Sequence, residues 1–178
     1  LSPVNPCRAL PVVLALAATL ALSGCAERYR TGTNLTCPRA LFVAGTESQT
    51  RFAGADRGDD AVTAQVRLSG IQYSCDTRRA DARAEVSFTV AAVRRNAAQA
   101  GSIDVPYFVA VVDAQGRIIA KQAFAVRLSF VANVGTATTT EKVQETIPLA
   151  DGRSAVGYEI LVGIQLTPEE LEYNLARR

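Results

Sequence analysis

Apolar residues recur at every second position through most of the chain beyond residue 60. The first such run begins at Val62 and reaches Leu68, and similar runs cover 86–92, 118–130 and 156–166. A period of two places successive side chains on opposite faces of a strand, so each run predicts a β-strand with one buried face. The segment 105–112 is apolar at nearly every position, which indicates a central strand covered on both faces.

Turn and loop signals separate these runs. The phase of the alternation slips at Gly70, which predicts a bulge, and a hairpin turn is expected at Gly116. The polar segments 45–60 and 133–140 are expected to be loops. About seven strands result, and residues 37–178 are expected to form an all-β domain, a single antiparallel β-sandwich.

This layout resembles immunoglobulin-like and fibronectin type III-like sandwiches, and the resemblance is one of architecture alone. A short helix is expected to follow the last strand, over residues 168–177. Thr167 suits the N-cap, Pro168 suits the first helical position, and Glu170 completes a capping box.

The N-terminal segment has the pattern of an export signal. Arg8 precedes fourteen apolar residues, 9–22, which are too few to cross a bilayer and fit the apolar region of a signal peptide. The motif that follows, Leu22-Ser23-Gly24-Cys25, resembles the lipobox of bacterial lipoproteins. The resemblance implies a signal peptide at 1–24, cleavage between Gly24 and Cys25, and diacylglycerol on the Cys25 thiol. The alternatives are an ordinary secretory signal and an uncleaved anchor.

The residue after the lipobox cysteine bears on location. It is Ala26 and not Asp, and by the same resemblance this points to the outer membrane. Residues 25–36 are expected to form a lipidated tether reaching at most ~40 Å. The domain would then face the periplasm, held to the membrane by its lipid.

Two cysteines remain after processing, Cys37 and Cys75. Because an even number of cysteines remains and the expected compartment is oxidising, we predict a disulfide between them. A reactive thiol or a metal site is the alternative, but the chain has no His to complete one.

The composition removes several routes to chemistry. The chain has no His, Met or Trp, so the commonest general base, the thioether ligand and the strongest aromatic platform are absent. The formal net charge is +2, which does not suggest nucleic acid binding. We therefore expect no enzyme and no cofactor beyond the covalent lipid.

Four clusters of residues are candidate sites. Their residues are a weak Ca²⁺ candidate at Asp56, Asp59 and Asp60; a basic patch at Arg78, Arg79, Arg83, Arg94 and Arg95; glycosidase-like carboxylates at Glu169, Glu170 and Glu172; and the aromatic residues Tyr73, Tyr107 and Tyr158. The favoured interpretations are a solvated loop, a mixed-charge turn, helix capping and core packing, in that order.

The leading hypothesis for function is a membrane-anchored, non-enzymatic interaction or accessory module of an envelope complex. Edge strands or the loops 45–60 and 133–140 would contact its protein partner. The alternative is a lipoprotein that binds a lipid or small ligand, which an enclosed apolar pocket would favour. An enzyme would need two carboxylates converging in a cleft.

Overall fold

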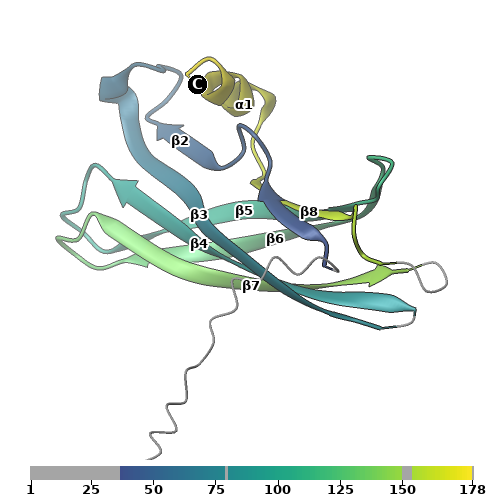
Figure 1. Ribbon diagram of the computed structural model, residues 1–178. Coiled ribbons are helices and arrows are strands. Elements are labelled where there is room, and N and C mark those ends of the chain that lie inside the picture. Colours follow the sequence, from purple (N-terminus) through teal and green to yellow (C-terminus); the bar gives the residue numbers. More distant parts are fainter. Residues whose placement is uncertain (1–36, 79, 150–153, 178) are drawn as a thin grey trace, which may run out of the picture. The chain divides into compact units, whose positions relative to one another are not determined.

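The computed structural model describes residues 37–78, 80–149 and 154–177, so Gly24, Cys25 and the rest of the expected leader and tether lie outside the described residues. The described part contains eight strands and one α-helix (Figure 1). The strands are β1 (Arg39–Phe42), β2 (Ser48–Phe52), β3 (Val62–Thr77), β4 (Asp81–Arg94), β5 (Gly101–Val112), β6 (Ile118–Phe130), β7 (Thr136–Pro148) and β8 (Glu159–Ile164). A short 3₁₀ turn, Asp59–Ala61, precedes β3, and α1 (Pro168–Leu175) follows β8.

The strands form two four-stranded sheets, in the orders β1-β8-β5-β6 and β2-β3-β4-β7. The predicted all-β sandwich is confirmed. Neighbouring strands run antiparallel except β1 and β8, which pair in parallel. As predicted from its apolar sequence, β5 lies inside its sheet, between β8 and β6.

The core lies between the two sheets and follows the alternation of the sequence. Every second residue of β4, from Ala82 to Ala92, is buried, and the same holds for Val126, Leu128 and Phe130 of β6. Phe88 is at the centre, in edge-to-face contact with Phe42 and Tyr107. The period-two pattern therefore identifies the buried faces of these strands.

The two predicted backbone irregularities are present. Gly70 has φ +63°, and the register between β3 and β4 shifts between Ser69 and Gln72, as expected from the phase slip. Gly116 has φ +78° in the turn between β5 and β6. The buried Asp113 carboxylate accepts hydrogen bonds from backbone N–H groups and from the Arg117 guanidinium, which lower its pKa.

Three expectations were wrong in part. The segment 45–60 contains strand β2, and β7 begins at Thr136, inside the expected loop 133–140. Tyr73 is 40% exposed, whereas Tyr107 is buried and Tyr158 packs against the core. The threonine-rich start of β7 has no apolar alternation, so only its pairing with β4 reveals it as a strand.

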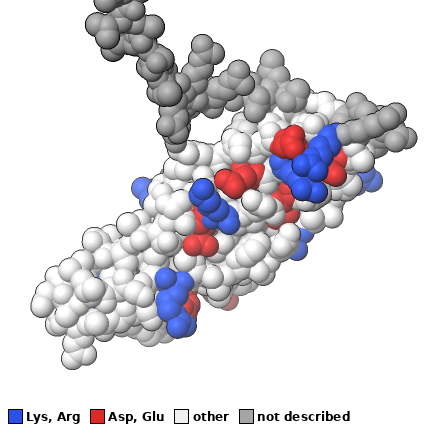
Figure 2. Space-filling view, turned by 90° about the horizontal axis from the view of Figure 1, so that it is seen from below, with Lys and Arg blue, Asp and Glu red and all other residues white. Residues whose placement is uncertain are grey.

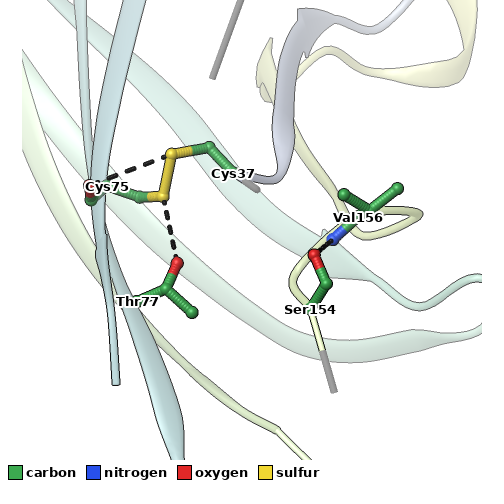
Figure 3. The surroundings of a disulfide bond; sticks show 5 residues. All are labelled: Cys37, Cys75, Thr77, Ser154 and Val156. Carbon is green, nitrogen blue, oxygen red and sulfur yellow. Dashed lines mark hydrogen bonds between the residues drawn. A yellow bond between two sulfur atoms is a disulfide. The ribbon is translucent and has the colours of Figure 1, made fainter. Parts of the chain in front are cut away.

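The expected disulfide joins Cys37 to Cys75 (Figure 3). It connects the residue that precedes β1 to β3, in the other sheet, near the β3–β4 connection. Thr77 lies beside the Cys75 sulfur, with its hydroxyl oxygen 3.6 Å away. The disulfide therefore fixes the start of the domain to one end of the sandwich.

The strand directions define two ends. The disulfide end holds Cys37, the β3–β4 connection and the β5–β6 turn. The opposite end, called the arginine end below, holds the connections 53–61, 95–100 and 131–135. The connections 95–100 and 131–135 lie together at the left of Figure 1. The backbone N–H of Asn133 donates a hydrogen bond to the Ala97 carbonyl and joins them. The sixteen residues of β3 separate the two ends, by about 50 Å along the strand.

Helix α1 begins as predicted. Thr167 and Glu170 form the capping box, but the helix ends at Leu175 rather than at residue 177. Asn174 Nδ2 donates to the carbonyls of Gly45 and Ser48, at 2.7 Å each, and so docks the helix against the connection between β1 and β2. Among the described residues no helix is long and apolar enough to cross a membrane.

Candidate functional site: an arginine-lined hollow

A hollow of about 690 Å³ lies at the arginine end of the sandwich. Three arginines line it, Arg51 from β2, Arg94 from β4 and Arg95 just after β4, together with one acidic residue, Asp60. Its apolar lining is Ala53, Ala61, Val62, Ala64, Ala97 and Ile103. The hollow is open to solvent, so it is not the enclosed apolar pocket that would mark a buried lipid site.

Arg94 ties the connections of this end together. Its Nη2 donates to the carbonyls of Ala97, Gln99, Val131 and Val134, and its guanidinium carbon lies 4.6 Å from the centre of the Phe130 ring. Its Nε is buried and has no hydrogen-bond partner in the described part of the chain. Arg94 thus fixes the shape of the hollow and leaves one donor unsatisfied.

Arg51 bridges the two sheets beside the hollow. Its Nη2 donates to the backbone carbonyl of Asp104 on β5, and its Nε donates to the side-chain oxygen of Gln49. The Asp104 carboxylate is held by Arg127, at 2.6 and 2.9 Å, and these bonds lower the pKa of Asp104. The charge of Arg51 also lowers the pKa of Asp104, but the hydrogen bonds of that carboxylate go to Arg127 and not to Arg51.

Arg95 lines the hollow from the position just after β4. Its guanidinium donates to the backbone carbonyls of Asp59 and Asp60, and its Nη1 lies 3.9 Å from the Asp60 carboxylate. A second hollow of about 290 Å³ shares Val62, Thr63, Ala64, Arg94 and Arg95 with the first and includes Val93. The two hollows therefore adjoin each other where β3 begins and β4 ends.

Exposed apolar side chains occur at both ends of the sandwich, and at this end they lie beside the arginines. Val93, Val131 and Val134 are 56%, 65% and 39% exposed. Each belongs to the end of β4 or to the connection between β6 and β7, next to the carbonyls that Arg94 holds. Exposed apolar surface beside guanidinium groups that are not fully paired with carboxylates is typical of a binding surface.

A different polar cluster closes the side of the sandwich between the edge strands β6 and β7. Tyr107 donates its hydroxyl hydrogen to Glu141, and burial together with this carboxylate raises the pKa of Tyr107. Gln122 donates its amide to Glu145, which is 4% exposed and whose pKa burial raises. Both glutamates point inward from β7, but they take different partners, and neither lines the arginine hollow. Inward-pointing charges on an edge strand oppose pairing with another chain.

The weak Ca²⁺ candidate does not assemble. The Asp56 carboxylate accepts from the backbone N–H of Gly58, and the Asp60 carboxylate faces Arg95. Arg95 donates to the backbone carbonyl of Asp59. Within the described residues no three acidic, His or Cys side chains converge on a point.

The structure divides the arginines that the sequence grouped. Arg78 and Arg83 lie at the disulfide end, paired with Asp76 and Asp81, whereas Arg94 and Arg95 lie at the other end of β4. Arg79 lies outside the described residues. Sequence reasoning did not select Arg51 for the hollow, because it lies in the segment expected to be a loop and carries no local signal. Glu170 caps α1, as interpreted from the sequence.

Charged side chains elsewhere are mixed in sign. Figure 2 shows a face on which basic and acidic groups lie beside one another rather than in separate patches. Ion pairs such as Lys142–Glu85, with nitrogen and oxygen 3.8 Å apart, have this character. The excess of arginine over carboxylate in the hollow differs from this arrangement.

No protein-family description, curated protein or solved structure matches this chain.

Proposed function

We propose that this chain is a lipid-anchored protein of the bacterial envelope whose sandwich is a non-enzymatic interaction module. Cys25 would carry the lipid in the outer membrane, and residues 26–36 would tether the domain on the periplasmic side. The arginine end would be the contact surface for a partner in an envelope complex.

One observation carries this proposal: Cys37, the first described residue, and the hollow lie at opposite ends of the sandwich. The tether would enter at Cys37, which the disulfide holds against Cys75 near one end of β3. The hollow is built around the other end of β3, at Val62 to Ala64. A domain held at the first end can present the second to a partner away from the anchor.

The character of the surface supports the same end. Three connections and the exposed side chains of Val93, Val131 and Val134 meet there, with the guanidinium groups between them. The long edge strand β7 is a poorer docking edge, because Glu141 and Glu145 point inward from it.

Photocrosslinking in cells tests the proposal with two matched positions. Val131 at the arginine end is 65% exposed, and Ile118 at the disulfide end is 64% exposed. With a photoreactive residue at 131 we expect a discrete crosslinked envelope protein, and with the same residue at 118 we expect none. The 131 crosslink should disappear in the Cys25→Ala variant, because the chain would no longer be anchored.

Mass spectrometry of the isolated chain tests the anchor separately. The expected product begins at Cys25 and carries diacylglycerol and an N-acyl group. A chain with a free thiol at Cys25, or equal crosslinking from positions 118 and 131, would overturn the proposal.

A further inference from the structure

We propose that the arginine hollow binds an anionic amphiphile, a phosphate head group joined to an alkyl chain. The guanidinium groups would hold the phosphate, and the apolar lining would cover the start of the chain. This inference rests on the proposed function, because it takes the arginine end as the contact surface. It adds the chemistry of what binds there.

The charge of the lining selects an anion. Three of the residues that line the hollow are arginines and one, Asp60, is acidic, so the lining carries an excess of two positive charges. Of the other acids nearby, Asp59 lines the adjoining hollow and Asp104 is paired with Arg127. Two excess positive charges complement a phosphate monoester dianion, whose oxygens match the planar fork of guanidinium donors.

The present contacts of the arginines leave that charge usable. Arg51 donates to a backbone carbonyl and to the side-chain oxygen of Gln49, which are neutral acceptors. The Arg95 side chain is 57% exposed and lies 3.9 Å from the Asp60 carboxylate, too far for a hydrogen bond. The Nε of Arg94 is buried and has no partner among the described residues, so this donor is not committed to another acceptor there.

The apolar part of the lining selects the alkyl chain. Val62, Ala64 and Ile103 line the same hollow as the three arginines. A volume of about 690 Å³ lies within the range of small-molecule sites, which combine a mostly apolar lining with a few polar groups. Inorganic phosphate would leave the apolar lining exposed to water, and a neutral alkyl chain would leave the guanidinium groups without a counterion.

The test uses the purified, membrane-derived full chain in phosphatidylcholine nanodiscs, with hexyl phosphate as the probe. Saturation-transfer NMR against empty nanodiscs reports binding to the protein. We expect hexyl phosphate to bind about tenfold more tightly than either inorganic phosphate or hexanol, because only the amphiphile makes both kinds of contact. Hexyltrimethylammonium, which has the opposite charge, should not compete with it.

Two arginines provide a matched pair of variants. Arg95 in the hollow and Arg83 at the disulfide end each lie 3.9 Å from one aspartate, with side chains 57% and 60% exposed. Arg95→Gln should weaken hexyl phosphate binding about tenfold, and Arg83→Gln should leave it unchanged. Arg51→Gln should act like Arg95→Gln, whereas Arg94 is left intact because it holds three connections together. Unchanged thermal unfolding of Arg95→Gln establishes that the hollow keeps its shape.

The source of the phosphate is separated by a second set of nanodiscs that contain phosphatidic acid. Competition by these nanodiscs, lost in Arg95→Gln, would identify a membrane lipid as the source. Binding of free hexyl phosphate without such competition would identify a soluble amphiphile, and either result supports the proposal. Equal binding of hexanol and hexyl phosphate, inorganic phosphate binding as tightly as hexyl phosphate, or an unchanged affinity in Arg95→Gln would overturn it. These measurements do not depend on crosslinking or on the state of Cys25, so the two proposals can fail separately.

Discussion

Gln122 on β6 donates its side-chain amide to both carboxylate oxygens of Glu145 on β7, at 3.3 and 3.2 Å. Those strands are the long outer strands of different sheets, so this contact links the sheets where no backbone ladder does. Glu145 is nearly inaccessible to solvent, and the Gln122 amide that donates to its carboxylate is neutral. The link therefore contains a carboxylate whose charged form is disfavoured by burial.

Glu145→Gln should stabilise the domain at neutral pH. Burial raises the pKa of Glu145 above its ordinary value of 4.5, so the folded chain binds this proton more tightly than the unfolded chain. The free energy of unfolding should consequently fall as the pH rises from 4.5 through the folded-state pKa. The variant removes that dependence and should gain about 1 kcal/mol at pH 7.5 in urea unfolding. Glu85→Gln, which affects an exposed ion pair with Lys142, is the control and should change little.

Gly163→Ala should destabilise the domain strongly. A Cβ at position 163 would lie 2.1 Å from Thr46 Oγ1 and 2.8 Å from the Phe108 ring, inside van der Waals contact. We expect a loss of about 3 kcal/mol, measured by chemical unfolding, because Thr46 is buried and Phe108 belongs to the central strand β5. Gly54→Ala is the comparison: nothing lies within 4 Å there, and only its φ of +80° opposes a side chain. Adding Thr46→Ala to Gly163→Ala should restore part of the loss, and no restoration would contradict the steric explanation.

Replacing both Cys37 and Cys75 by Ser should lower stability without changing the sheet order. The disulfide closes a loop with a sequence separation of 38 residues, for which the chain-entropy model gives about 3–4 kcal/mol. Unfolding of the double variant should match that of the reduced natural chain. A natural chain equally stable with and without reductant would show that the disulfide contributes nothing.

Asn174→Ala should release α1 from the sandwich while the helix start stays intact. The variant removes both side-chain hydrogen bonds to the carbonyls of Gly45 and Ser48. We expect a cost of about 2 kcal/mol and faster hydrogen exchange in α1 than in the strands. Thr167→Ala, which removes the cap at the other end of the helix, should fray the first turn instead. Exchange rates in α1 that Asn174→Ala leaves unchanged would show that other contacts dock the helix.

The sequence by itself determined most of the strands and which of their faces are buried. A period of two decides which side chains of β4 and β6 turn inward, whatever strand lies beside them. The shift at Gly70 and the helix start at Thr167 are equally local, because each depends on the conformation of a few neighbouring residues. The cysteines 37 and 75 could be paired by elimination once the other two were assigned to the leader and the lipobox.

Only the tertiary structure decided which strands become neighbours and what gathers at their ends. No local pattern marks β2 as a strand or makes β1 pair in parallel with β8, because each gains its hydrogen bonds from a distant segment. The hollow has the same origin: Arg51 and Arg94 are far apart in sequence and meet because β2 ends where β4 ends. Alternation specifies a face of a strand but not its partner, since pairing is a long-range contact that the chain selects only on folding.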